Sequence, residues 1–62
     1  MAARPRPLAA YVAAYIAAIR NYRQHLARCR RCNRAVHCRH GSRRHTDCLR
    51  TQAAYRAARA RR

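Results

Sequence analysis

The chain has 62 residues and a formal net charge of +15, because sixteen arginines face a single acidic residue and lysine is absent. It has no Phe or Trp, and alanine supplies much of its 50% hydrophobic fraction, so a large apolar core is excluded and a disulfide, a metal or a partner is expected to stabilise the fold. The charge predicts a polyanionic partner, namely DNA, RNA or an anionic membrane surface.

Residues 1–7, M-A-A-R-P-R-P, are predicted to form a disordered basic arm, because two prolines and two arginines offer little to pack. Pro7 suits the first turn of a following helix. The longest apolar run, Leu8–Ile19, has 12 residues, against about 20 needed to span a bilayer. A basic start before an apolar run also fits a signal peptide in outline, but no convincing small-residue cleavage site accompanies it. We therefore expect no membrane span and a cytoplasmic protein.

The next segment, residues 8–28, has apolar side chains at alternating spacings of four and three, and alanine fills most other positions up to Ala18. Alanine is the strongest helix former, and this repeat predicts a helix with one apolar stripe for packing on another helix. The stripe is wide for a short partner helix, so a homodimer or a protein partner bound through Leu8–Leu26 is an alternative. Its members are Leu8, Val12, Tyr15, Ile19, Tyr22, Leu26 and Cys29, widened by Tyr11.

Residues 29–48 hold all four cysteines, three of the four histidines and the only glycine, and they are predicted to form a metal-binding loop. Gly41–Ser42 is typical of a turn. Thr46 and Asp47 favour a helix N-cap, so a second helix is predicted over residues 47–60. Small side chains of that helix are predicted to lie against the first one, namely Leu49, Ala53, Ala57 and Ala60.

The expected fold is therefore all-α, with one small domain over residues 8–62 built as a helical hairpin around a zinc-finger-like loop. Structural zinc sites use four Cys or His ligands, often as short-spaced pairs. Cys29 and Cys32 form one pair. His45 and Cys48 offer a second pair, giving C-x2-C-x12-H-x2-C, whereas all four cysteines give C-x2-C-x5-C-x9-C. The preferred ligands of one zinc ion are Cys29, Cys32, Cys38 and Cys48, with His45 and His25 as alternates.

Neighbouring arginines support metal binding, because positive charge favours the thiolate over the thiol. Disulfides and unligated cysteines stay open as alternatives. A catalytic zinc needs an open position and a general base, but the only carboxylate, Asp47, occupies a predicted helix cap. We therefore expect a closed structural site and no enzymatic activity.

The segment from His25 to Cys32 reads H-x3-C-x2-C and resembles the motif of zinc-binding anti-sigma factors. That resemblance implies His25, Cys29 and Cys32 as zinc ligands and a sigma factor as partner, although this chain lacks the upstream Cys of the family. The spacing C-x2-C-x5-C, which ends at Cys38, is similar to that of WhiB-like iron–sulfur transcription factors. It implies an iron–sulfur cluster as an alternative cofactor.

Together these features predict a small zinc-binding protein that binds DNA or RNA mainly through arginine–phosphate contacts, with weak sequence preference and steep salt dependence. Three alternatives remain: a transcription regulator docking on a sigma factor, polymerase or larger assembly, a basic component of a nucleoprotein particle, and an amphipathic membrane binder. The predicted contact residues are Arg30, Arg31, Arg34, Arg39, Arg43 and Arg44, followed in the second helix by Arg50, Arg56 and Arg59.

Overall fold

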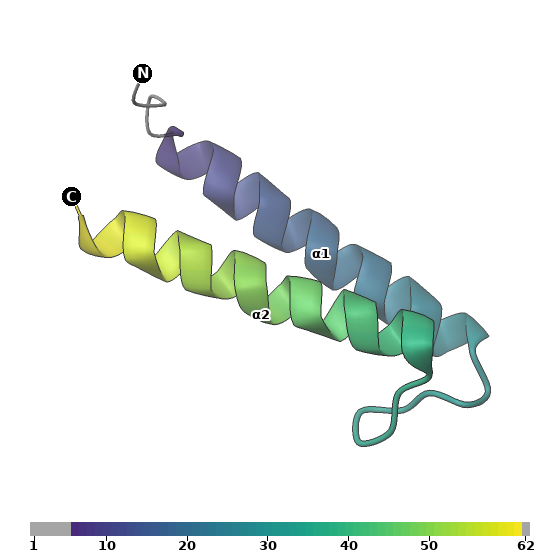
Figure 1. Cartoon of the computed structure of the whole chain (residues 1–62). Helices are drawn as coiled ribbons and strands as arrows, with labels where there is room; N and C mark the ends of the chain where they lie inside the picture. The colour runs from purple at the N-terminus through teal and green to yellow at the C-terminus, as the bar shows by residue number, and fades with distance from the viewer. Residues whose placement is uncertain (1–5, 62) are drawn as a thin grey trace.

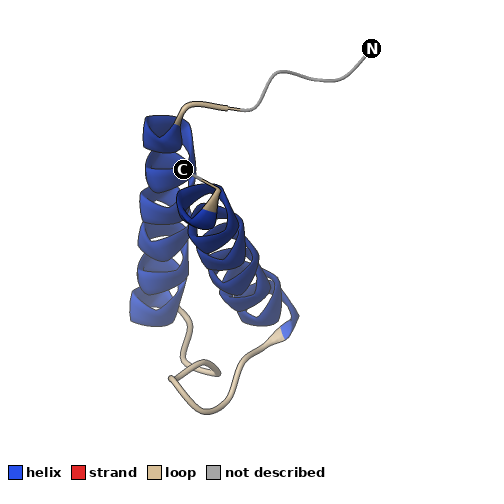
Figure 2. Cartoon of the chain, turned by 90° about the vertical axis from the view of Figure 1, so that its left-hand side faces the viewer, coloured by secondary structure: helices blue, strands red, loops and turns tan. Residues whose placement is uncertain are grey.

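The computed structural model describes residues 6–61 and shows a helical hairpin (Figure 1). Helix α1 (Leu8–Arg28) and helix α2 (Arg39–Ala60) lie side by side and run antiparallel, joined by a loop of residues 29–38 (Figures 1 and 2). Residues 6–61 contain no strand. The predicted all-α fold is confirmed. The predicted basic arm falls mostly on residues 1–5, which lie outside the described part of the chain.

Helix α1 spans the range over which the apolar repeat runs. Pro7 precedes it in an extended conformation, with φ of −61° and ψ of 149°, and accepts a hydrogen bond from the Ala10 N–H at 2.9 Å. The helix ends because Cys29 leaves helical geometry, with φ of −102° and ψ of 114°, while its N–H still donates to the His25 carbonyl. The end of α1 is therefore also the place where the cysteine-rich loop begins.

Helix α2 begins at Arg39, well before the predicted start at Asp47. Its N-cap is Cys38, whose sulfur accepts a hydrogen bond from the Gly41 N–H. Gly41 and Ser42 therefore lie in the first turn of helix α2. The prediction that they form a turn between the helices was wrong. The loop is correspondingly shorter, over residues 29–38. A sulfur cap is not among the usual Ser, Thr, Asp and Asn signals, which explains why Asp47 was the favoured start.

The stripe of α1 faces α2, and each of its residues is half-buried. The side of α2 that meets it carries Gly41, which is buried, and a half-buried row at alternating spacings of three and four: Arg44, Cys48, Thr51, Tyr55 and Ala58. The predicted small-residue row was wrong, because Leu49 is 54% exposed and Ala53, Ala57 and Ala60 are exposed as well. The rotation of α2 follows from Gly41, which must face the end of α1.

The interior of this hairpin is thin. Among the described apolar residues only Ala18 (8% exposed) and Cys32 (9%) are buried, and Ile16 is 47% exposed on α1. A chain with so little buried apolar surface needs another source of stability. No helix within residues 6–61 combines the length and the apolar character needed to cross a membrane.

Candidate metal centre

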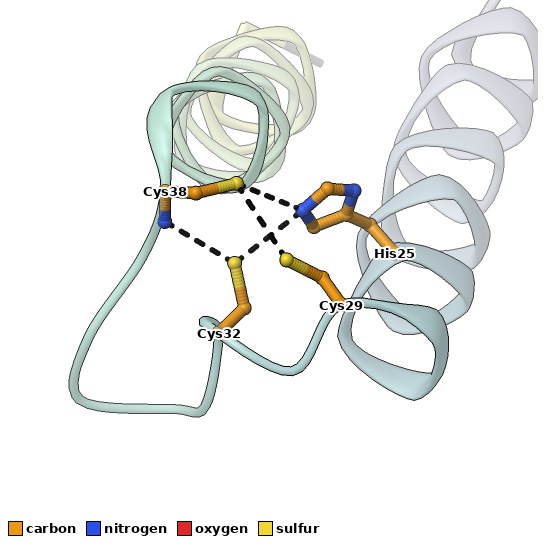
Figure 3. Close-up of side chains that lie close together, drawn as sticks. All are labelled: His25, Cys29, Cys32 and Cys38. Carbon is orange, nitrogen blue, oxygen red and sulfur yellow. Dashed lines mark hydrogen bonds between the residues drawn. The ribbon is translucent and has the colours of Figure 1, made fainter.

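Four potential metal ligands meet where α1 ends and α2 begins (Figure 3). They are His25, Cys29, Cys32 and Cys38, and one ligand atom from each lies within 4.8 Å of all the others. Within residues 6–61 no other group of three or more His, Cys, Asp or Glu side chains is gathered this closely. The cluster could therefore hold one metal ion between the two helices.

The first two members come from the end of α1. His25 lies in its last turn, and Cys29 follows four residues later, so both side chains lie on the same side of the helix. The Cys29 N–H donates to the His25 carbonyl at 2.8 Å, and the Cys32 N–H donates to the Cys29 carbonyl at 3.2 Å. This turn folds Cys32 back toward the helix, which is what the C-x2-C spacing requires.

Asn33 returns the chain from Cys32 to α2. Its side-chain oxygen accepts hydrogen bonds from the N–H groups of Ala35 (2.7 Å) and Val36 (2.8 Å), and its own N–H donates to the Val36 carbonyl at 2.8 Å. Asparagine is favoured where a side chain replaces a backbone partner in a tight turn. The compact turn allows Cys38 to reach the cluster six residues after Cys32.

Three distances within the cluster are close to those of a tetrahedral zinc site. The Nε2 atom of His25 lies 3.2 Å from Cys38 Sγ and 3.4 Å from Cys32 Sγ, and Cys29 Sγ lies 3.9 Å from Cys38 Sγ. Zinc bonds of about 2.3 Å to sulfur and about 2.0–2.1 Å to nitrogen place tetrahedral ligands about 3.8 Å apart for two sulfurs and about 3.5 Å apart for sulfur and nitrogen. The side chains therefore stand close to ligating positions.

Backbone N–H groups surround the sulfurs. The Cys38 N–H donates to Cys32 Sγ at 3.2 Å, and the Gly41 N–H donates to Cys38 Sγ at 3.4 Å, at the positive end of the α2 dipole. The Gly41 N–H, aided by hydrogen bonds from Cys32, His25 and Cys29 and opposed by burial, lowers the pKa of Cys38 to about 6. A thiolate, which is the ligand form, is thus favoured at Cys38 near neutral pH.

Cys32 is in a different environment. The Cys38 N–H acts to lower the pKa of Cys32, but burial and the neighbouring Cys38 and Cys29 outweigh it, so the pKa is raised. Like charges that crowd one site are expected to disfavour the second thiolate. A bound divalent cation would reverse this effect, because it stabilises every thiolate that it ligates.

Gly41 is in the first turn of α2 because the site leaves no room for a side chain. A Cβ atom at this position would lie 2.8 Å from Cys32 Sγ, 3.3 Å from His25 Cδ2 and 3.4 Å from His25 Nε2. The closest of these contacts is shorter than real Cβ atoms show. The helix can therefore come this close to the cluster only because residue 41 is a glycine. The single glycine of the chain serves close approach and not a turn.

The structure brings together three of the four preferred cysteines and the alternate His25, but not Cys48. Cys48 lies further along α2, where its thiol donates to the Ala18 carbonyl at 3.3 Å. Burial and then the nearby Asp47 raise the pKa of the Cys48 thiol. Cys48 comes ten positions after Cys38, which along the helix amounts to a rise of about 15 Å. The residue gathered with Cys29, Cys32 and Cys38 is therefore the alternate His25, and Cys48 lies apart from them.

The alternate His45 is also outside the cluster. Its ring stacks on His37, with centroids 4.9 Å apart and planes at 20°, and lies 5.4 Å from the ring of Tyr22. The Tyr22 hydroxyl hydrogen-bonds His37 Nε2 at 2.7 Å. These three rings tie the loop to both helices. The signal that identifies His25 instead is its place one helical turn before Cys29.

The arginines predicted to contact nucleic acid lie on the loop and on α2. All are exposed except Arg44, which is half-buried and donates to the His40 carbonyl at 3.3 Å. Arg50 forms a salt bridge with Asp47 at 2.7 Å, and it is the only salt bridge within residues 6–61. The remaining guanidinium groups have no carboxylate within salt-bridge distance in residues 6–61, so this surface is strongly positive.

No protein-family model, curated protein or solved structure matches this chain. The metal cluster and the arginine-rich surface are therefore the features from which a function can be inferred.

Proposed function

We propose that this protein is a zinc-stapled helical hairpin that binds nucleic acid through arginine–phosphate contacts. The zinc part of the proposal rests on one observation: one nitrogen and three sulfur ligand atoms lie within 4.8 Å of one another. Cys3His is a common ligand set of structural zinc. One ion held by these side chains joins α1, the loop and α2, and it replaces the apolar core that the chain lacks.

The site is proposed to be structural and not catalytic. Four protein ligands complete a tetrahedron, so no position remains for a substrate or an activated water. The only carboxylate of the chain, Asp47, pairs with Arg50 and is not among the four clustered side chains. An iron–sulfur cluster is less well supported, because such clusters usually take four cysteine ligands. Thiolate ligands also suit a reducing compartment such as the cytoplasm.

The nucleic-acid part of the proposal is carried by the charge. A formal charge of +15 with a single acid, Asp47, leaves the arginine surface with one internal counter-charge, which pairs with Arg50. Nucleic acid is the polyanion whose phosphates bind arginine bidentately, and each neutralised phosphate releases a counterion. We therefore expect the association constant to fall steeply with salt. Titration of a labelled duplex at several salt concentrations tests this, and an affinity that hardly changes would overturn it.

Zinc is tested directly by native mass spectrometry and elemental analysis of the purified protein. We expect one zinc per chain and loss of helical circular dichroism on chelation, because metal-binding energy becomes folding energy in small domains. Iron in place of zinc would support the cluster alternative. Unchanged helicity after complete metal removal would overturn the proposed stapling role.

A protein partner is the second candidate, favoured by exposed apolar side chains. Ile16 on α1, Val36 in the loop and Leu49 on α2 are 47%, 58% and 54% exposed. Such a partner could be a second copy of the chain, a sigma factor, a polymerase or a nucleoprotein particle. A stoichiometric complex that survives nuclease treatment would favour this candidate. Sedimentation analysis would distinguish a homodimer from a complex with another protein.

A further inference from the structure

The side of α2 that faces away from α1 carries a straight row of exposed residues. They recur at spacings of four and three, which keeps them on one face of a helix. We call this row the outer stripe. It consists of Arg39, Arg43, Thr46, Arg50, Ala53, Ala57 and Ala60. The half-buried row that meets α1 lies on the opposite side of the same helix, so α1 leaves the whole stripe open to solvent.

The outer stripe is slim as well as basic. Between and beyond its arginines it carries only Thr46 and alanines, so the helix presents little bulk apart from the flexible arginine side chains. A helix is about 10–12 Å across with its side chains, and the major groove of B-form DNA is about 12 Å wide and admits one. The shape and the charge of this face therefore suit the same partner.

The arginines of the stripe are spaced to follow the groove floor. From Arg39 to Arg50 the helix rises about 16 Å, which corresponds to roughly five base pairs at about 3.4 Å each. Arginine is the side chain that most often contacts base edges in this groove. At the same end of α2, the exposed loop residues Arg30, Arg31 and Arg34 can reach the flanking phosphates.

We propose that α2 docks in the major groove of double-stranded DNA through the outer stripe. The inference rests on the proposed nucleic-acid binding and specifies the partner and the face that meets it. Duplex RNA is a poor alternative, because its A-form major groove is deep and narrow and excludes such a helix. Phosphate contacts still supply most of the affinity, and the zinc site holds α2 so that its outer face stays clear of α1.

A steric probe tests the inference without altering charge. Thr46→Trp places a bulky side chain at the middle of the stripe, and Ala13→Trp places the same side chain on the exposed surface of α1. Affinity for a DNA duplex of about two helical turns is measured by fluorescence anisotropy, with circular dichroism and zinc content as checks on folding. We expect about tenfold weaker binding for Thr46→Trp and little change for Ala13→Trp.

Two further measurements use the unaltered protein. In a duplex whose cytosines carry glucosylated hydroxymethyl groups, the sugars fill the major groove and the phosphates stay unchanged. We expect the protein to bind this duplex about tenfold more weakly than the plain duplex. Duplex RNA of the same sequence is expected to bind more weakly too. Equal affinity for the plain and the filled duplex would overturn groove docking even if Thr46→Trp proved unstable.

The failure of this inference can be told from the failure of the proposed function. Binding that depends steeply on salt, but is indifferent to groove filling and to Thr46→Trp, would leave phosphate binding intact and remove the docking mode. No binding to any duplex or single strand at low salt would remove both. An equal loss of DNA affinity in Thr46→Trp and Ala13→Trp would also count against the outer stripe. It would show that the exposed surface of α1 contributes to binding as much as the stripe does.

Discussion

The two ends of the hairpin are held in different ways. At the loop end, His25 and three cysteines converge, and Tyr22, His37 and His45 add ring contacts and a hydrogen bond. The outermost side-chain hydrogen bond between the helices in residues 6–61 is that from Cys48 to Ala18. Beyond it, the half-buried row of α2 consists of Thr51, whose hydroxyl donates to carbonyls of its own helix, Tyr55 and Ala58. Specific polar geometry therefore fixes one end, and the other end follows from it.

This difference predicts that the hairpin depends on the metal proposed to bind at its loop end. Cys38→Ser replaces a proposed ligand that also caps α2, and we expect it to abolish stoichiometric zinc and most of the helical signal, because little core remains to hold the helices. Mass spectrometry and circular dichroism measure the two effects. Cys48→Ala is the matched control, since Cys48 lies outside the cluster, and it should retain one zinc. Equal loss of zinc in both variants would contradict the proposed ligand set.

The next largest effect is expected at Gly41. Gly41→Ala places a Cβ atom within 2.8 Å of Cys32 Sγ, so zinc affinity should fall by roughly tenfold or more. This is a sharp test because alanine favours helix over glycine, and helix propensity alone predicts a gain. Competition with a zinc chelator measures the affinity. Ser42→Ala, at the exposed neighbouring position, should leave it unchanged.

The open end should respond more weakly and without loss of metal. Tyr55 is half-buried and lines a hollow with Val12 and Tyr15. Tyr55→Ala is expected to lower the free energy of unfolding of the zinc-loaded protein by about 1–2 kcal/mol, roughly half the value for a fully buried aromatic side chain. Thermal melts measure this. Leu49→Ala on the exposed face should change it by less than about 0.5 kcal/mol, and a larger loss there would assign Leu49 to an interface.

The smallest effect concerns the salt bridge of Arg50 with Asp47. Both side chains are largely exposed, at 76% and 49%, so the pair contributes little to stability. Asp47→Asn frees Arg50 for phosphate and removes one negative charge, so duplex affinity at low salt should rise by about twofold to threefold. The gain should vanish at high salt. Weaker binding would show that Asp47 positions Arg50 on the nucleic acid.

The sequence predicts much of this fold because its strongest patterns are local. The apolar repeat from Leu8 to Leu26 is regular enough to define a helix and the face that packs. The start and rotation of α2 are not local properties. Both depend on Cys38 acting as a cap and on Gly41 touching Cys32, and these contacts exist only when the cluster is formed. Glycine before serine, taken alone, is typical of a turn.

The sequence predicted a metal-binding type of site and the three cysteines that the cluster contains. Spacing identifies Cys29 and Cys32, and their place one turn after His25 supports that histidine as well. Spacing does not exclude Cys48, since a loop of residues 29–48 would allow it to return to the cluster. Only the early start of α2 carries Cys48 away along a rigid helix, and that start lacks a sequence signal.

The compact span of the cluster bears on the order of folding. All four clustered side chains come from residues 25–38, so closing this segment costs little chain entropy, whereas the contact of Cys48 with Ala18 joins positions 30 residues apart. Contacts that are near in sequence form fastest. The cluster can therefore assemble while the helices are still apart and present Cys38 as a ready cap. Helix α2 would then grow outward from that nucleus and meet α1 last at the chain ends.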